Sequence, residues 1–187
     1  MAKSRSAERR PPVFGQFIRD IVFGTNDALL TNIGIITGFT ASLVSNRLII
    51  LAVIVDIFTS AFAMSIGTYL SRTSEDDYFG TSLTRQTKLS VDKALANPFV
   101  AAAVMWIVYV ISGFIPLLPF FFGLEPADAA KAAVGLGAAT FIVVGIFKGK
   151  VTRTSVRKSA LQFFLLGGAA ALIGYAIGTL ASKLGFH

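Results

Sequence analysis

Polar side chains interrupt an apolar segment of the chain at Phe23-Gly24-Thr25-Asn26-Asp27-Ala28-Leu29-Leu30-Thr31. Asp27 lies in the middle of this stretch, and Asp56 interrupts the next apolar segment in the same way. An ionised carboxylate at the depth of the lipid tails costs from about 2.5 to about 10 kcal/mol or more. Because the chain carries two of them, we expect both carboxylates to face a polar path and to bind a cation or a proton.

The composition of the chain is that of a membrane protein. Of its 187 residues, 54% are hydrophobic and only 14% are charged, whereas soluble domains are about 25% charged. The sequence has no cysteine, and its single histidine is the last residue, His187. Disulfides, thiolate or histidine metal sites and Ser/His/Asp triads are therefore excluded. No phosphate-binding loop or dinucleotide fingerprint is present, so we expect a protein that is not an enzyme and has no cofactor.

Five apolar segments are each long enough to cross a membrane, which takes about 20 residues. They lie near residues 21–44, 48–70, 98–122, 129–148 and 160–182. We therefore predict an all-α integral membrane protein with a five-helix transmembrane domain at 21–182. The rest of the chain is expected to form a cytoplasmic tail and interfacial segment (1–20), a cytoplasmic loop (72–97) and a short C-terminal tail (183–187).

Proline and glycine mark particular points of these segments. Pro116 and Pro119 are expected to break the third helix near the membrane interface. In the fifth segment, Gly174 and Gly178 have the small-xxx-small spacing that lets two helix backbones approach closely. This motif is weak when it stands alone, so a position at a helix contact and a position away from one remain equal alternatives.

The distribution of basic residues predicts the orientation. Fourteen of the 17 Lys and Arg residues lie in the N-terminal tail, in the loop after the second span and between the fourth and fifth spans. Positively charged loops stay in the cytoplasm, so we expect a cytoplasmic N-terminus and a C-terminus on the far side. The same distribution explains the net charge of +7 without a nucleic-acid partner. The expected location is the cytoplasmic membrane of a prokaryote or a vacuole-type membrane of a eukaryote.

Polar side chains on the first two spans are candidate metal ligands. On the second span they are Asp56, Ser60 and Met64, which share one side of the helix because of their spacing of four residues. On the first span they are Asn26, Asp27 and Thr31. Oxygen donors suit hard cations, and a thioether shifts the preference toward softer divalent ions such as Fe²⁺, Mn²⁺ or Co²⁺. Two carboxylates in one desolvated site repel each other, which suits the exchange of protons for a divalent ion.

Each of these residues also has a structural interpretation. An intramembrane Asp can serve as a fixed hydrogen-bonding group, and Met64 can belong to the apolar core. The hydroxyls of Thr31 and Ser60 commonly hydrogen-bond to a neighbouring helix or to their own backbone. The acidic cluster that contains Glu75 and Asp77 either collects cations or caps a helix. The combination of polar residues on two adjacent spans favours a pathway more than any one of them does.

Four stretches of sequence carry a family resemblance. They are 23–31, 61–71, 97–102 with 115–119, and 157–178. The first is similar to the motif Gly-x-Asn-Asp-Gly-Leu-Val-Thr and the second to Ser-Met-x-x-Gly-Glu-Tyr-x-Ser, both of the vacuolar iron transporter family. Because the four stretches together span nearly the whole chain after its N-terminal tail, the sequence resembles that family along its length.

The resemblance implies a homodimer of five-helix protomers in the lipid bilayer. It also implies exchange of cytoplasmic Fe²⁺ or Mn²⁺ for protons from the far side. Independently of the resemblance, Co²⁺ and Zn²⁺ are further candidates for the transported ion. In the family the pathway lies between the two protomers, and its lining residues correspond here to Asp27, Asp56 and Met64. The pattern of polar residues points to the same three positions.

The chain departs from the family in two places. Thr68 stands where the family has a glutamate near the cytoplasmic mouth, and residues 72–97 stand in place of a long Glu-rich domain. Metal entry would then fall to Thr68, Glu75 and Asp77, with weaker transport or an altered cation preference. Two other functions therefore stay open: a membrane assembly partner or sensor that does not transport, and a transporter of a different solute.

Overall fold

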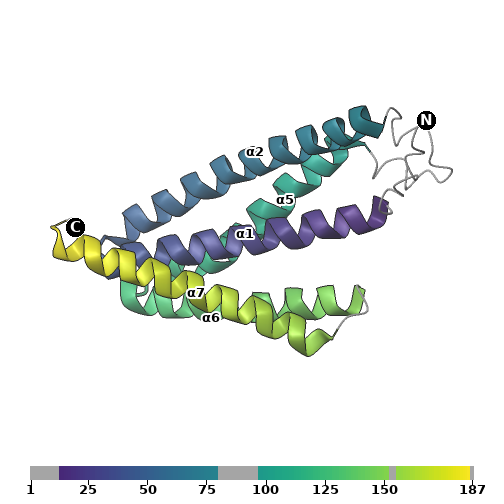
Figure 1. Cartoon of the computed structure of the whole chain (residues 1–187). Helices are drawn as coiled ribbons and strands as arrows, with labels where there is room; N and C mark the ends of the chain where they lie inside the picture. The colour runs from purple at the N-terminus through teal and green to yellow at the C-terminus, as the bar shows by residue number, and fades with distance from the viewer. Residues whose placement is uncertain (1–12, 80–96, 152–154, 186–187) are drawn as a thin grey trace, which may run out of the picture.

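The fold consists of long helices (Figure 1). The computed structural model describes residues 13–79, 97–151 and 155–185. Its elements are α1 (Val13–Ala41), α2 (Asn46–Phe79), α5 (Pro98–Leu117), the 3₁₀ helix η1 (Leu118–Phe122), α6 (Pro126–Val151) and α7 (Val156–Lys183). No strand occurs in these three ranges. The prediction of an all-α fold with five long helices is therefore confirmed.

Helix α1 lies at the centre of the bundle and contacts α2, α5, α6 and α7. Those four helices are long and apolar enough to cross a membrane. Helix α1 has 29 residues, about 43 Å at 1.5 Å per residue, but Asn26, Asp27 and Asn32 make it less apolar. Its position explains this composition, because a helix with neighbours on several sides can turn polar groups away from lipid. The Asn32 side chain, for example, is fully buried.

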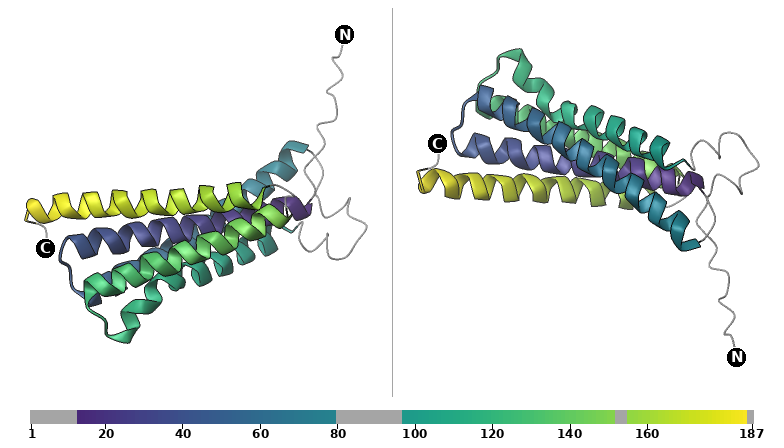
Figure 2. Two further views of the ribbon diagram at one scale, coloured as in Figure 1. Left: turned by 90° about the horizontal axis from the view of Figure 1, so that it is seen from below. Right: turned by 90° about the horizontal axis from the view of Figure 1, so that it is seen from above.

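Helix α1 begins and helix α7 ends at opposite ends of the bundle, as Figures 1 and 2 show. An odd number of membrane crossings requires this arrangement. We call the end at which α1 begins and α2 ends the N-terminal end of the bundle. Its assignment to the cytoplasm stays a prediction from the basic residues.

Two helices extend beyond their predicted spans at the N-terminal end. Helix α1 starts at Val13, so residues 13–20, expected in an interfacial segment, form the first turns of the same helix. Helix α2 continues to Phe79, so the start of the predicted loop 72–97 is helical. This extension contains no proline or glycine, and each residue added to a helix gains a backbone hydrogen bond. The rest of the predicted tail and loop, 1–12 and 80–96, lies outside the described residues.

Local sequence signals set both ends of α5. The Asn97 side chain accepts a hydrogen bond from the Phe99 backbone N–H at 2.9 Å. Pro98 occupies the first turn of the helix, where its missing N–H costs nothing. The helix runs through Pro116 and stops at Leu117, where the backbone tightens into η1. The break expected near the two prolines is present, one residue after the first of them.

Small residues let α1 and α7 pack with their backbones in contact. Gly34 and Gly38 on α1 face Gly174 and Gly178 on α7, and a Cβ atom added to Gly178 would overlap the Gly38 carbonyl oxygen. The Ser42 hydroxyl donates to the Gly178 carbonyl oxygen at 3.0 Å, from one helix to the other. Of the two alternatives for the small-xxx-small motif, the structure therefore supports the helix contact.

A buried ion pair joins α1 to α2 near the N-terminal end. The Arg72 guanidinium donates to the Asp20 carboxylate, and the two side chains are only 2% and 10% exposed. Arg19 approaches the same carboxylate at 3.4 Å from a more exposed position. The sequence predicts Asp20 in an interfacial segment and Arg72 in a loop. The structure has both residues in helices, because α1 and α2 continue past their predicted spans and bring the two side chains together. The sequence analysis did not predict this pair.

Arg72→Met is expected to lower the free energy of unfolding by about 3 kcal/mol, because the Asp20 carboxylate loses its buried partner. The double variant Asp20→Asn/Arg72→Met leaves no charge of this pair behind and should recover most of the loss. Denaturant unfolding in detergent, followed by circular dichroism, measures both variants. A wild-type unfolding free energy for Arg72→Met would show that the pair contributes nothing to stability.

Candidate metal site

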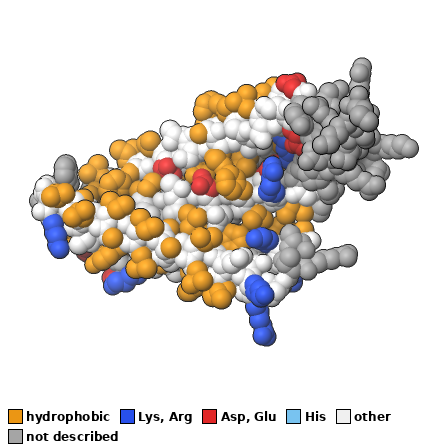
Figure 3. Space-filling model, viewed as in Figure 1, with side chains coloured by type: hydrophobic (Ala, Val, Ile, Leu, Met, Phe, Trp, Pro, Cys, Tyr) orange, Lys and Arg blue, Asp and Glu red, His pale blue; other side chains and the backbone are white. Residues whose placement is uncertain are grey.

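The two intramembrane carboxylates lie close enough to interact. Asp27 is on α1 and Asp56 on the adjacent α2, and the two carboxylates are within electrostatic reach of each other. Both side chains are half-buried in the single chain. Figure 3 shows the face of the bundle that is toward the viewer in Figure 1, and acidic side chains lie midway along it among hydrophobic ones. The fold therefore brings together the two acids that the sequence suggests for one site, and their role as metal ligands stays a prediction.

The two carboxylate oxygens of Asp56 have different surroundings. Oδ1 accepts a hydrogen bond from the Ser60 hydroxyl at 3.0 Å. Oδ2 is buried and has no hydrogen-bond partner among the described residues. A buried acceptor without a partner costs about 1–3 kcal/mol, and more when it is charged. A proton or a cation at Oδ2 would remove this cost.

Tyr109 on α5 joins this group, although the sequence analysis did not identify it. Its side chain is fully buried, and its hydroxyl lacks a hydrogen-bond partner in the described part of the chain. The hydroxyl lies near those of Thr31 and Ser60, without the geometry of a hydrogen bond, and within electrostatic reach of both carboxylates. Buried tyrosine hydroxyls usually have a partner. A tyrosine in the middle of an apolar span was the signal that could have pointed to it.

Met64 lies beside this group, toward the N-terminal end. It packs against a buried cluster of Ala28, Ala61 and Tyr109. Eight residues separate it from Asp56, which is about 12 Å along the helix axis. Metal–ligand bonds are about 2.0–2.3 Å long. The spacing therefore favours successive positions along a path for Asp56 and Met64 over a single coordination shell.

The hydroxyls among the predicted residues already take part in hydrogen bonds. Thr31 donates to the Asp27 carbonyl oxygen and Thr68 to the Met64 carbonyl oxygen, each at 2.9 Å. The backbone interpretation is therefore correct for Thr31, whereas the Ser60 hydroxyl donates to a carboxylate instead. A hydroxyl that donates in this way keeps its oxygen lone pairs. All three oxygens can still accept or coordinate.

A cleft of 400 Å³ extends from Met64 toward the N-terminal end. Its polar lining is Arg19, Asp20, Thr68, Ser71 and Arg72. Thr68, which stands where the resembling family has a glutamate, therefore borders an accessible space next to Met64. The buried ion pair described above lines the same space. This cleft is the best candidate for an entry path to the carboxylates.

Three of the predicted pathway residues lie apart from this cleft. Asn26 lines a different cleft, between α1, α6 and α7. Glu75 and Asp77 are on the last turns of α2, about 16 and 20 Å beyond Met64 along the helix axis. Neither lines the cleft next to Met64. Their role in metal entry stays a prediction.

The carboxylates of one chain do not form a closed metal site. No group of three or more Asp, Glu, His or Cys side chains could hold a metal ion within the described ranges. Two carboxylates alone leave most positions around a divalent ion unfilled. The remaining ligands would have to come from hydroxyl oxygens, water or a second protomer.

The chain is similar to known transporters along most of its length. The model of the VIT family matches residues 18–90 and 81–179. The vacuolar iron transporter of Centaurea cyanus is 26% identical over 220 aligned positions, which cover 90% of each chain. Vacuolar iron transporter 1 of Arabidopsis thaliana is 22% identical, with 87% of this chain and 85% of its own covered. Vacuolar iron transporter homolog 3 of the same plant is 29% identical, and the alignment covers 86% of this chain and 80% of the homolog.

The lengths of these alignments differ. At nearly the same coverage of this chain, the alignment with transporter 1 takes 217 positions and that with homolog 3 takes 164. Transporter 1 therefore contains segments without a counterpart here. The family match begins within α1, at residue 18, and continues into α7, through all the elements that form the carboxylate site. The chain belongs to the VIT family.

Proposed function

We propose that this protein carries a divalent transition-metal ion, Fe²⁺ or Mn²⁺, out of the cytosol in exchange for protons. It belongs to a family of metal transporters and is not an enzyme. The observation that carries the proposal is the buried Asp56 Oδ2 without a partner, beside Asp27 and the Tyr109 hydroxyl. Within a bundle of apolar helices, such a site is incomplete until a proton or a cation occupies it.

The charge of the site supports an exchange of protons for metal. A divalent ion bound between ionised Asp27 and Asp56 leaves no net charge, and neither do two protons bound in its place. A net charge within the lipid would cost several kcal/mol. We therefore expect two protons to move for each metal ion, in an electrically neutral cycle.

Met64 supports selection of a transition metal. Mg²⁺ and Ca²⁺ take oxygen ligands, whereas a thioether is a soft ligand that suits first-row transition ions better. Met64 borders both the entry cleft and the cluster that contains Tyr109. An ion that passes from the cleft to the carboxylates would meet its sulfur on the way.

A homodimer would complete the site. Asp27 and Asp56 are half-buried in the single chain, and the face of the bundle drawn in Figure 3 has acidic side chains among many hydrophobic ones. Contact with the same face of a second chain, about a twofold axis, would shield the carboxylates from lipid. It would also bring a second pair of carboxylates near the first. The ligands that one chain lacks could then come from its partner.

Purified protein in liposomes tests this proposal. The liposomes contain one dye for protons and one for metal, and receive Fe²⁺ or Mn²⁺ outside under anaerobic conditions. Entry of metal should be accompanied by a fall in luminal proton concentration, and Ca²⁺ should give neither signal. Metal entry without proton movement would contradict antiport. The absence of entry for every metal tested would contradict transport and favour an assembly partner or sensor.

Tyr109→Phe is expected to lower the rate of metal transport about tenfold, because we expect its hydroxyl, which has no partner in the described structure, to form one hydrogen bond to a charged group during transport. Because the hydroxyl is buried without a partner, its removal should leave the stability unchanged or raise it by about 1 kcal/mol. Tyr175→Phe, at an exposed position of α7, is the matched control. Wild-type transport in Tyr109→Phe would remove this hydroxyl from the site.

A further inference from the structure

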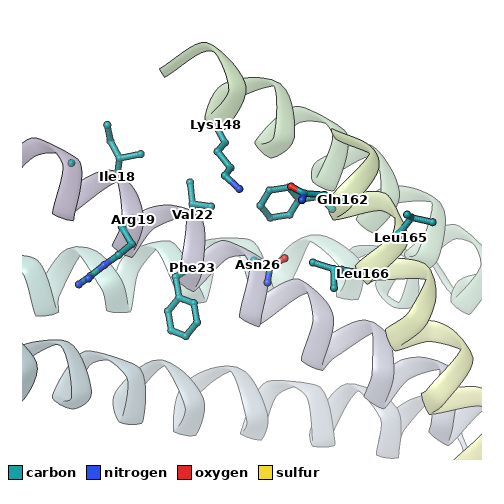
Figure 4. Close-up of a pocket in the computed structure, with 11 residues that line it drawn as sticks. Ile18, Arg19, Val22, Phe23, Asn26, Lys148, Gln162, Leu165 and Leu166 are labelled. Atoms are coloured by element: carbon teal, nitrogen blue, oxygen red, sulfur yellow. The ribbon is translucent and has the colours of Figure 1, made fainter. Parts of the chain in front are cut away.

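A second cleft, of 810 Å³, opens near the N-terminal end between α1, α6 and α7 (Figure 4). Most of its wall is hydrophobic: Ile18, Val22, Phe23, Phe163, Leu165 and Leu166. Its polar side chains are Arg19, Asn26, Lys148 and Gln162. Two of these are cationic, and none of the described lining residues is an acid. We call this space the basic cleft.

The polar groups of the basic cleft gather on one side of it. In Figure 4 the Lys148 ammonium and the Gln162 amide project from α6 and α7 into the space beside α1, where Asn26 lies. Arg19 points away from them. The Lys148 Nζ atom lies 5.3 Å from the centre of the Phe163 ring. The Asn26 Oδ1 atom is buried and has no hydrogen-bond partner within the described ranges.

The basic cleft lies where charged helix ends meet the apolar spans. Lys148 and Lys150 are in the last turn of α6, and Arg157 and Lys158 begin α7. Leu166 lies about two turns further along α7, toward the middle of the bundle. The cleft therefore offers the basic Lys148 and the Gln162 amide toward its outer part and the hydrophobic side chain of Leu166 deeper in, where Asn26 also lies (Figure 4). A phospholipid has the same two parts in the same order.

The charge of the cleft decides which ligand it suits. Lys148 repels a divalent metal ion, and no described acid lines the basic cleft to offset it, so we leave this cleft out of the metal path, although Asn26 adjoins Asp27 in sequence. Basic pockets between transmembrane helices attract anionic headgroups, and each Lys or Arg near the surface contributes to that attraction. A free phosphate ion would leave the hydrophobic wall uncovered, whereas a lipid chain would cover it.

We infer that the basic cleft binds one anionic phospholipid. Its phosphate accepts from the Lys148 ammonium and the Gln162 amide. Its acyl chain lies along Phe163 and Leu166. This inference does not depend on the proposed transport function, because no residue of the carboxylate site takes part.

Native mass spectrometry of the full-length protein in detergent tests the inference. The protein is titrated with phosphatidylglycerol and, separately, with phosphatidylcholine of the same acyl chains. Phosphatidylglycerol should bind at least about fivefold more tightly, since one basic side chain contributes about 1 kcal/mol. The Lys148→Gln variant should bind phosphatidylglycerol and phosphatidylcholine about equally tightly. Lys150→Gln, two residues on and outside the cleft, should keep the preference for phosphatidylglycerol.

A second variant keeps the test valid if Lys148→Gln does not fold. Leu166→Trp narrows the cleft without changing its charge. It should weaken phosphatidylglycerol binding at least as much as Lys148→Gln does. An equal loss in Lys148→Gln and Lys150→Gln would overturn the inference in favour of general surface charge. Displacement of the lipid by millimolar inorganic phosphate would show a site for a free anion instead. A dimer that excludes the lipid, while the monomer binds it, would show that a second copy fills the cleft.

Discussion

Asp27→Asn should reduce metal-driven proton movement in liposomes at least about 100-fold. The amide has nearly the shape of the carboxylate but cannot balance the charge of the ion, so a bound divalent ion would leave one net positive charge among apolar helices. Such an uncompensated buried charge costs about 3 kcal/mol or more, which corresponds to a factor of more than about 100 in binding. The dye-loaded liposomes described above measure the effect on metal and protons together.

The matched control for this variant is Asp128→Asn. Asp128 is an exposed acid of α6 that pairs with Lys131 at 2.8 Å, far along the chain from the carboxylate pair, and its replacement should leave transport unchanged. The double variant Asp27→Asn/Asp56→Asn should reduce metal-driven proton movement no further than either single variant does, because the effects of residues that act as one unit are not additive. Wild-type flux in Asp27→Asn would take this carboxylate out of the mechanism. A loss of folded protein in that variant, seen by size-exclusion chromatography, would instead reveal a structural role.

Gly178→Ala should lower the free energy of unfolding by about 3 kcal/mol, the upper part of the range for overpacked sites. The added Cβ atom would overlap the backbone carbonyl of Gly38, which cannot move without moving α1. The Ser42 hydroxyl bond to the Gly178 carbonyl would also be displaced. Denaturant unfolding in detergent measures the change. Because α1 carries Asp27, the transport rate should fall as well.

Gly168→Ala provides the control on the same helix. A Cβ atom at Gly168 would meet open space, and alanine is the better helix former by about 1 kcal/mol. This variant should therefore be as stable as the wild type or slightly more so. If Gly178→Ala and Gly168→Ala have the same stability, the close approach of α1 to α7 does not contribute to the fold.

Much of the architecture follows from the sequence. Segments of about 20 apolar residues can satisfy their backbone groups in lipid only as helices, so the all-α fold with five long helices was predictable. The Asn97-Pro98 start of α5 and its stop after Pro116 follow from local backbone chemistry as well. Helix periodicity also placed Asp56, Ser60 and Met64 on one side of α2, because neighbours on a helix face depend only on spacing.

The partner of each side chain was decided by the tertiary structure. The sequence contained Asp20, Arg72 and Tyr109, but nothing in their spacing shows that the first two form a pair or that the third is buried near the carboxylate site. Gly174 and Gly178 allowed a close contact, and only the packing of α7 on α1 supplied Gly34 and Gly38 as its other half. Spacing along a chain determines which residues share a helix face. What that face meets depends on how helices far apart in sequence cross, because packing is a property of the whole bundle.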